Sequence, residues 1–220
     1  MPAPSSDRAP DAPAPRYAPP RVRRAVIALA AALTVAGVGG GALLPYLTIE
    51  HPLWLLATSA DGRNIVLATP RLDAVTLALV AVPRRALGML ATFGLGWLYG
   101  DATRAWSARR LPRLSRLIEL LERMFARYPR AALVLWPTYT TSALAGARGA
   151  PWRQFVPWML VGQLVYVWAC VEIGAALAGW TTRVVAWVSP HLLEATLASL
   201  GAAALYQLVA WRKRRTRAAG

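Results

Sequence analysis

The run from Ala25 to Ile49 most constrains how this chain folds, because none of its 25 residues carries a charge. A transmembrane helix needs about 20 consecutive apolar residues, so the run is long enough to cross a bilayer. A basic segment before an apolar run is also typical of a signal peptide. The run is longer than the about 7–15 residues of a signal core. We therefore expect an uncleaved first membrane span.

Charge and hydropathy fit together only if they occupy different stretches of the chain. Hydrophobic residues make up 56% and charged residues 16%, and mean hydropathy is +0.38, yet the net charge is +15. Soluble proteins carry about 25% charged residues. Further apolar runs cover residues 73–100, 154–180 and 184–211. One Cys and two His leave little material for disulfides or a metal site. We expect an all-α polytopic membrane protein with about four transmembrane helices and neither metal nor cofactor.

Two other apolar segments are too short for a straight crossing. Residues 51–69 are interrupted by the polar sequence Asp61-Gly62-Arg63-Asn64 and form either an external loop or a re-entrant hairpin. Residues 131–147 are interrupted between Pro137 and Ser142 and fit a re-entrant hairpin better. Irregular backbone at membrane depth must be buried in protein or face a water-filled cavity. We expect two oppositely oriented hairpins in an inverted-repeat arrangement.

The basic residues set the expected orientation. Residues 1–24, 101–130, 148–153 and 212–220 hold 20 of the 25 Lys and Arg. By the positive-inside rule these segments, and both termini, are cytoplasmic. Arginine outnumbers lysine 24 to 1, which suggests a GC-rich bacterium and hence its plasma membrane.

The same segments divide the chain into parts. We expect a disordered Pro-rich tail over 1–24, a single membrane domain over 25–211, and a basic tail over 212–220. Apolar residues recur at i+3 and i+4 through 111–128, which predicts an amphipathic helix in the headgroup layer. The alternative is that this helix packs on another protein element.

Asp73 opens the run 73–100, and after it Arg84 and Arg85 are the two charges in the run. An arginine at the centre of a membrane helix costs about 2.5–3.5 kcal/mol on insertion scales, so it usually faces a cavity or a partner. Successive helical residues diverge by about 100°. One arginine would meet Glu172 or a lipid phosphate, and its neighbour the backbone carbonyls of a hairpin. The alternative is that Pro83 breaks the segment and both arginines lie at the membrane interface.

Other polar residues are weaker candidates. Glu172 is the acid inside the run 154–180 and would be a proton site or an arginine's partner. Glu50, Asp61, Arg63, Asn64 and Asp73 surround the first hairpin and form either a polar gate or a solvated outer loop. Gly94, Gly96 and Gly100, and the glycines between 37 and 41, indicate close helix packing through small residues.

Several residues in the second half of the chain form a pattern. Its elements are Pro137, Ala145-Gly146, Phe155, Gly162 and the region Tyr166–Trp168. With His51-Pro52, Arg63-Asn64 and the segment Gly96 to Gly100, this pattern resembles the DedA family, also called VTT or SNARE-associated membrane proteins, over roughly residues 50–180. Three features depart from the family pattern. The first hairpin has only Glu50 and Pro52 in place of a Glu among several Pro, an expected acid falls at Met89, and residues 136–142 contain no arginine.

The resemblance implies an activity and a site. Family members implicated in lipid movement carry polyprenyl-phosphate or phospholipid, so we expect a flippase or scramblase and not an enzyme. The alternative is a membrane scaffold that kept the fold without transport, and a lipid enzyme lacks any recognisable catalytic set. The partners would be anionic or phosphate-headgroup lipids and not nucleic acid, with homo-oligomers left open. The expected substrate-binding residues are Arg84, Arg85, Glu172, Glu50, Arg63, Asn64, Pro137 and Gly146.

Overall fold

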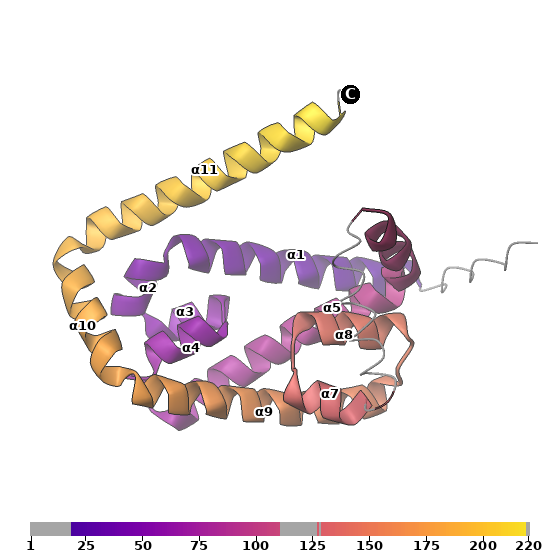
Figure 1. Cartoon of the computed structure of the whole chain (residues 1–220), viewed down its shortest axis with the longest axis horizontal. Helices are drawn as coiled ribbons and strands as arrows, with labels where there is room; N and C mark the ends of the chain where they lie inside the picture. Colours follow the sequence, from indigo (N-terminus) through magenta and orange to yellow (C-terminus); the bar gives the residue numbers. More distant parts are fainter. Residues whose placement is uncertain (1–18, 111–126, 128, 219–220) are drawn as a thin grey trace, which may run out of the picture.

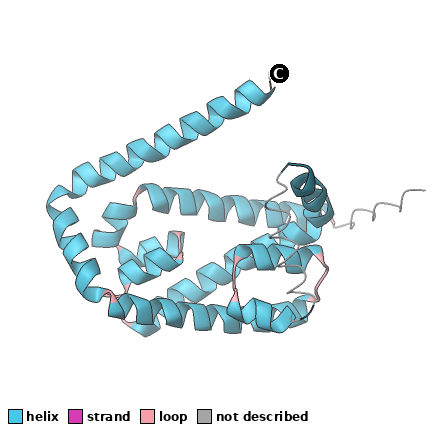
Figure 2. Ribbon diagram, viewed as in Figure 1, coloured by secondary structure: helices cyan, strands magenta, loops and turns pink. Residues whose placement is uncertain are grey.

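The computed structural model describes residues 19–110, 127 and 129–218, and within them it is helical with no strand (Figures 1 and 2). Four segments are long and apolar enough to cross a membrane: Pro20–Ala42, Ala74–Gly100, Trp152–Ala176 and Ala178–Val209. The expectation of an all-α chain with about four spans is confirmed. In chain order the helices are α1 (Pro20–Ala42), α2 (Leu44–Glu50), α3 (Pro52–Thr58), α4 (Gly62–Ala68), α5 (Ala74–Arg110), α7 (Pro129–Leu135), α8 (Tyr139–Ala147), α9 (Trp152–Ala176), α10 (Ala178–Val188), the 3-10 turn η1 (Ser189–His191) and α11 (Leu192–Ala218).

The first span differs from its prediction at both ends. Helix α1 already begins at Pro20, so residues 20–24 are helical and not part of a disordered tail. Proline suits a first helical position because its missing N–H needs no partner there. The helix ends at Ala42, and α2 follows after Leu43. Pro45 explains this ending, because it has no N–H to donate to the carbonyl four residues earlier. Residues 1–18 and most of the predicted amphipathic helix 111–128 lie outside the described residues.

Two pairs of short helices lie between the long ones. Helices α3, α4 and α7 have 7 residues each and α8 has 9. At about 1.5 Å per residue none approaches the roughly 30 Å of a hydrocarbon core. Residues 59–61, here called the first break, join α3 to α4, and residues 136–138, the second break, join α7 to α8. The two breaks lie at the inner ends of their pairs and face one another across the molecule (Figure 2).

Both breaks come earlier in the chain than the polar sequences indicate. Gly62, Arg63 and Asn64 form the first turn of α4 and not a loop. Helix α8 starts directly after Thr138, whose hydroxyl accepts from the Thr141 N–H at 3.3 Å. The Thr141 hydroxyl accepts in return from the Thr138 N–H at 3.2 Å. This capping box lets polar residues begin a helix that the sequence alone presents as a loop.

Helix α5 is the longest element and continues through Pro83. Its start is fixed by Asp73, whose Oδ1 accepts from the N–H groups of Val75 at 3.1 Å and Thr76 at 2.9 Å. Hydrogen bonds from the side chain and backbone of Thr76 hold the pKa of the Asp73 carboxyl below its usual value. The role of Asp73 is therefore to cap a helix rather than to gate a hairpin.

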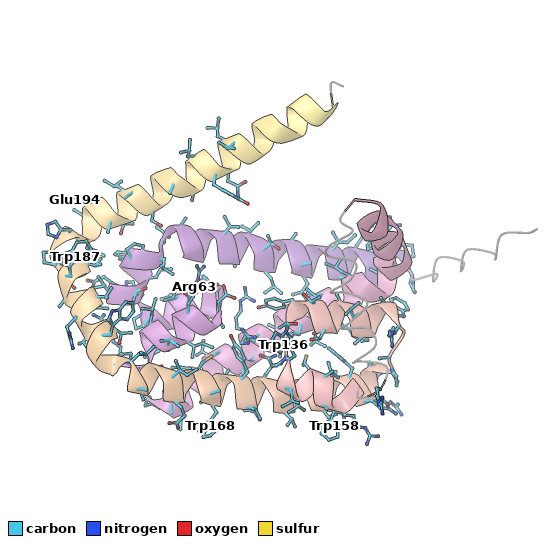
Figure 3. All side chains as sticks on the ribbon, in the orientation of Figure 1. Arg63, Trp136, Trp158, Trp168, Trp187 and Glu194 are labelled. Atoms are coloured by element: carbon cyan, nitrogen blue, oxygen red, sulfur yellow. The ribbon has the colours of Figure 1, made fainter. Side chains whose placement is uncertain are left out.

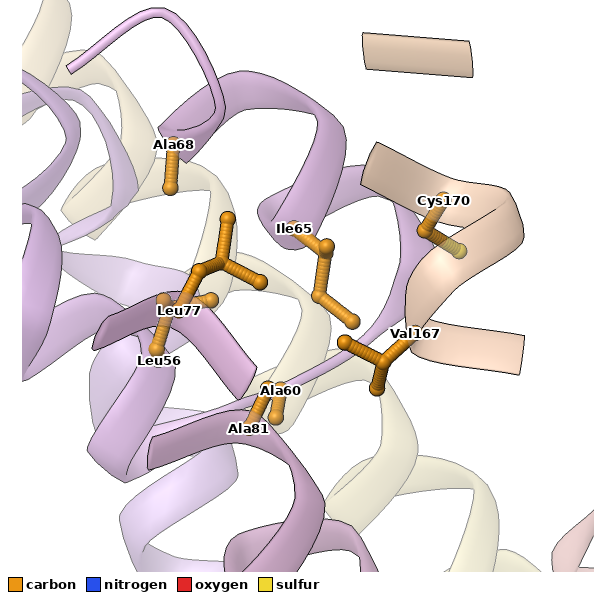
Figure 4. Close-up of a cluster of buried hydrophobic side chains, with 8 residues drawn as sticks. All are labelled: Leu56, Ala60, Ile65, Ala68, Leu77, Ala81, Val167 and Cys170. Carbon is orange, nitrogen blue, oxygen red and sulfur yellow. The ribbon is translucent and has the colours of Figure 1, made fainter. Parts of the chain in front are cut away.

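Two apolar clusters flank the middle of the molecule. The first joins α3, α4, α5 and α9 through Leu56, Ala60, Ile65, Ala68, Leu77, Ala81, Val167 and Cys170 (Figure 4). The second joins α5, α7, α8 and α9 through Ala86, Met89, Ala132, Leu133, Ala145, Phe155 and Met159. Each short pair thus has a core of its own, and α5 and α9 contribute to both.

Small residues allow α5 and α8 to pack closely, as predicted from the glycines. A Cβ added at Gly96 would overlap the carbonyl oxygen of Ala143, and one at Gly100 would overlap Ala147. Gly146 of α8 lies in the same way against the Phe93 carbonyl. On α1 the prediction holds only for Gly40, which faces Thr58. It is wrong for Gly37, Gly39 and Gly41, which have open space where a Cβ would be.

The last apolar run is bent. A straight span was expected over 184–211, but α10 and α11 meet at the 3-10 turn Ser189–His191, which contains Pro190. Helix α11 then runs away from the rest of the molecule (Figure 1). It contacts α1 and α2, where the Ser199 hydroxyl donates to the Gly41 carbonyl at 3.5 Å.

We predict opposite effects of Gly→Ala at two helical positions. Gly96→Ala should lower stability by about 1–3 kcal/mol, because the added methyl overlaps backbone that cannot move aside. Gly201→Ala is the matched control, since nothing lies within 4 Å of its Cβ position. It should leave stability unchanged or raise it by about 0.5–1 kcal/mol. Thermal unfolding in detergent compares them, and an unchanged Gly96→Ala protein would contradict the close packing of α5 on α8.

Candidate functional site

Arg85 lies at the centre of the molecule and binds both breaks. Its side chain is 5% exposed. The guanidinium donates from Nη1 to the Ala60 carbonyl at 3.0 Å and from Nη2 to the Pro137 carbonyl at 3.3 Å. Its Nε donates to Oε1 of Gln163 on α9 at 2.5 Å. We call Arg85, Gln163 and the carbonyls of Ala60 and Pro137 the tip junction.

The residues at the first break show why donors gather there. The end of a helix leaves its last carbonyls without intrahelical partners and carries the negative end of the helix dipole. Here four consecutive carbonyls, from Ala57 to Ala60, each accept from a side chain. Arg84 donates from Nε to Ala57 at 3.0 Å and from Nη2 to Thr58 at 2.7 Å. The amide of Asn64 donates to Ser59 at 2.7 Å, and Arg85 binds Ala60.

Arg84 and Arg85 reach different surroundings. Besides the first break, Arg84 donates from Nη2 to the Leu33 carbonyl of α1 at 3.2 Å. Arg84 is partly exposed, whereas Arg85 is buried. The alternative in which Pro83 breaks the helix is wrong on that point, because α5 is continuous through Pro83, and both arginine side chains bind carbonyls of the first break.

Gln163 is a site residue that sequence reasoning missed. It is fully buried, and its Nε2 donates to the Pro137 carbonyl at 3.4 Å and to the sulfur of Met89. A signal was present in the spacing, because Gln163 is the polar member of a stripe at every fourth residue of α9. The stripe is Phe155, Met159, Gln163 and Val167, opposite Phe93, Met89, Arg85 and Ala81 of α5.

Three observations establish this antiparallel ladder between α5 and α9. Phe93 and Phe155 stack with ring centroids 4.4 Å apart at one end. Arg85 and Gln163 form the polar rung, and Ala81 and Val167 belong to the first apolar cluster. The polar rung is therefore enclosed by apolar rungs on both sides.

Two tyrosines complete the surroundings of Arg85. Its Cζ lies 3.9 Å from the ring centroid of Tyr166 and 6.0 Å from that of Tyr139, within the range of cation–π attraction. Each ring covers a glycine: Tyr166 lies against Gly62 and Tyr139 against Gly88. In the sequence these tyrosines have the appearance of ordinary apolar-span residues, and only the fold brings them to the arginine.

The expected acidic partners are elsewhere. Within the described ranges, every acceptor of Arg84 and Arg85 is a neutral carbonyl or amide. Glu172 is exposed on α9 and binds neither arginine, so the expected pairing with Glu172 is not formed. Glu50 and Arg63 are also exposed, away from the guanidinium contacts. Of the predicted residues, the structure brings together Arg84, Arg85, Asn64 and Pro137, while Gly146 serves helix packing.

Asn64 retains one unused group. Its Oδ1 is buried and has no hydrogen-bond partner in the described part of the chain, although its amide nitrogen binds Ser59. Next to it, the Ser59 hydroxyl and the Asp61 carboxylate are 3.2 Å apart. Buried acceptors are nearly always satisfied by protein or by ordered water. One donor, from water or from a ligand, would complete the first break.

Comparisons of this chain with protein-family models, with curated proteins and with solved structures find no match. No group of three or more His, Cys, Asp or Glu side chains suited to a metal ion occurs among the described residues. Among the described residues, the groups that define the chemistry of the site are the two arginines and their neutral partners.

We predict that Arg85→Met destabilises the protein strongly. It leaves the Ala60 carbonyl and the Gln163 Oε1 without the donor they have now, and each buried unsatisfied group costs about 1–3 kcal/mol. We expect a loss of about 2–6 kcal/mol in thermal or denaturant unfolding. Arg63→Met is the control, because Arg63 is exposed on α4, and it should change stability by less than about 0.5 kcal/mol. Equal effects of both substitutions would refute the role given to the tip junction.

Proposed function

We propose that this chain moves a phosphate-headgroup lipid, a polyprenyl-phosphate or a phospholipid, across the membrane. The observation that carries the proposal is the pair Arg84 and Arg85, which binds the first break and, through Arg85, also the second, and whose acceptors among the described residues are all neutral. Two buried or half-buried positive charges with no carboxylate at ion-pair distance among these residues attract an anion, and a guanidinium N–H donates a charge-assisted hydrogen bond to a phosphate oxygen.

The proposal includes an inverted repeat, with α3–α4 and α7–α8 as re-entrant hairpins. Pro129 and Tyr139, which begin α7 and α8, lie 77 positions after Pro52 and Gly62, which begin α3 and α4. Trp152, which begins α9, lies 78 positions after Ala74, which begins α5. Each unit thus consists of a short helix, a break, a second short helix and a long span. Inverted repeats of this kind place a substrate site near the membrane midplane.

Side-chain contacts support the repeat. Gln163 lies 78 positions after Arg85, and Pro137 lies 77 after Ala60. Arg85 donates to Ala60, and Gln163 donates to Pro137, so each residue binds the break of its own unit. The additional bond from Arg85 to Pro137 then joins the two units.

The tyrosine and glycine pairs follow the same relation. Tyr139 and Tyr166 stand at the positions that Gly62 and Gly88 occupy in the first unit. Tyr166 covers Gly62, and Tyr139 covers Gly88, which are equivalent contacts with the residue types exchanged. Equivalent contacts at equivalent positions favour two units related by a twofold axis over an accidental arrangement of helices.

The two arginines have different roles in the proposed site. All three nitrogens of Arg85 already have acceptors. Arg84 uses Nε and Nη2, and its Nη1 has no acceptor among the described residues. Because Arg84 is also partly exposed, its Nη1 is the group that meets a headgroup phosphate. Glu50 and Glu172 lie apart from the arginines, so the proposal gives them no role in headgroup binding.

The orientation proposed for the membrane puts both termini in the cytoplasm. The starts of α1, α7 and α9 lie at one end of the molecule, together with the far end of α5 (Figure 1). At this end Arg130 lies 5.7 Å from the Trp158 ring and Arg153 lies 5.6 Å from the Trp152 ring. Trp158 and Trp168 point outward from α9 (Figure 3). Arginine and tryptophan at a span end are typical of a cytoplasmic interface, here that of a bacterial plasma membrane.

A scaffold without transport is the second candidate, and one observation favours it. The tip junction has the contacts of a structural element, because Arg85 satisfies backbone carbonyls that would otherwise be unpaired. A scaffold needs nothing more from the pair. It gives no reason for the Nη1 of Arg84, which lacks an acceptor in the described part of the chain, and this group therefore distinguishes the two candidates.

We predict that Arg84→Gln abolishes transport in protein that is still folded at the assay temperature, although the loss of bonds to the Ala57, Thr58 and Leu33 carbonyls should lower its melting temperature. The chain is reconstituted in phosphatidylcholine vesicles with a trace of acyl-labelled phosphatidic acid or labelled polyprenyl-phosphate, and exchange between leaflets is followed by quenching the label. We expect the protein-dependent rate to fall at least tenfold in Arg84→Gln. Arg63→Gln, with the same change of charge at an exposed site, should transport as the unaltered chain does. Equal rates for Arg84→Gln and the unaltered chain would contradict the proposal, and an unaltered chain that moves neither lipid would favour the scaffold.

A further inference from the structure

Two buried side chains near Arg85 are uncharged: Gln163, which binds Arg85, and Met89, which binds Gln163. The amide oxygen of Gln163 accepts a hydrogen bond from the Arg85 Nε at 2.5 Å. A glutamate carboxylate could accept the same bond and would add a negative charge. Met89 lies four residues after Arg85 on α5, the spacing at which Arg and Glu pair along a helix. Its sulfur accepts from the Gln163 amide.

We infer that Gln163 and Met89 are specificity-determining residues: Gln163 holds Arg85 in place, Met89 holds Gln163, and neither forms an ion pair with Arg85, so that the site selects anions. This inference rests on the proposed function and extends it to residues that do not touch the lipid. Gln163 orients Arg85, and the charge of Arg85 adds to that of Arg84 in attracting the headgroup.

The energetic argument concerns burial. Both Gln163 and Met89 are fully buried, and Arg85 is 5% exposed. Water therefore screens little of the field around Arg85, and a charge placed at either position acts on it strongly. A carboxylate at position 163 or 89 would form an ion pair with Arg85 and cancel much of the attraction for an incoming anion. Glutamine keeps the hydrogen bond and avoids this cancellation.

An alternative role for the two residues is packing alone. Packing would make stability, and not anion binding, depend on them. The two roles can be separated at position 89. Glutamate there changes the charge of the site, whereas glutamine changes only the shape of the side chain.

The experiment adds one negative charge beside Arg85 from two different helices. Gln163→Glu places it on α9, with Gln154→Glu as control, because Gln154 is exposed at the start of the same helix. Met89→Glu places it on α5, with Met89→Gln as the neutral control of matching size. Thermal unfolding of each full chain in detergent is measured in sodium phosphate and in sodium chloride of equal ionic strength. Lipid exchange is measured in the phosphatidylcholine vesicles with labelled phosphatidic acid.

We expect phosphate to raise the melting temperature of the unaltered chain by about 2–4 °C. Gln163→Glu and Met89→Glu should both lose this rise and at least nine-tenths of the exchange rate. Gln154→Glu should keep both properties. Met89→Gln should keep more of both than Met89→Glu does, because it alters the shape of position 89 and not its charge. The two acidic variants carry their charge on different helices. If one of them fails to fold, the other still tests the inference. Failure of both to fold would overturn the inference, since a carboxylate able to pair with Arg85 should be tolerated.

Two further results separate this inference from the proposed function. Folded acidic variants that keep the phosphate response and the exchange rate would overturn the inference and leave the proposed function intact. An unaltered chain that shows neither phosphate response nor exchange would overturn both.

Discussion

Where the chain leaves the helix between two short helices, its carbonyls lose their intrahelical donors, and the arrangement around Arg85 follows from how they are satisfied. At the first break the donors are Arg84, Asn64 and Arg85, which bind four consecutive carbonyls. At the second break they are Arg85 and Gln163, which share one carbonyl. The arginines are thus needed for the fold before they are available for any ligand. Any ligand would therefore meet guanidinium groups that already donate hydrogen bonds to the protein.

This double use explains the surroundings of the pair. The ladder of α5 and α9 brings Arg85 opposite Gln163 and encloses both between two apolar clusters. Neutral partners hold the guanidinium in a fixed geometry, and an acid at Met89 or Gln163 would hold it more tightly at the cost of its charge. Under the proposed function, the neutral side chains at positions 89 and 163 leave the charge of Arg85 to an anion.

Much of the architecture could be predicted from the sequence, because a bilayer imposes simple rules on length and charge. The uncharged runs predicted four spans, and Arg84 and Arg85 stood out as charges within one of them. The exact breaks were misplaced because polar residues such as Asn64 were assigned to a loop, although each could begin a helix once capped or buried. Gln163 and Tyr166 were missed because neither is charged, and their importance depends on contacts between residues far apart in the chain.

The packing of α5 on α8 and of α9 on α4 also bears on how the chain is made. Each long helix packs on the second short helix of the other unit, so the two halves are interlocked. While the ribosome is still producing residues beyond α5, Arg85 has no Gln163 and the first pair has no α9 to cover it. At that stage Arg85 has the Ala60 carbonyl, but its other two acceptors, Pro137 and Gln163, have not been synthesised. Insertion machinery, or lipid phosphate near the exit site, would have to shelter that charge until α9 arrives.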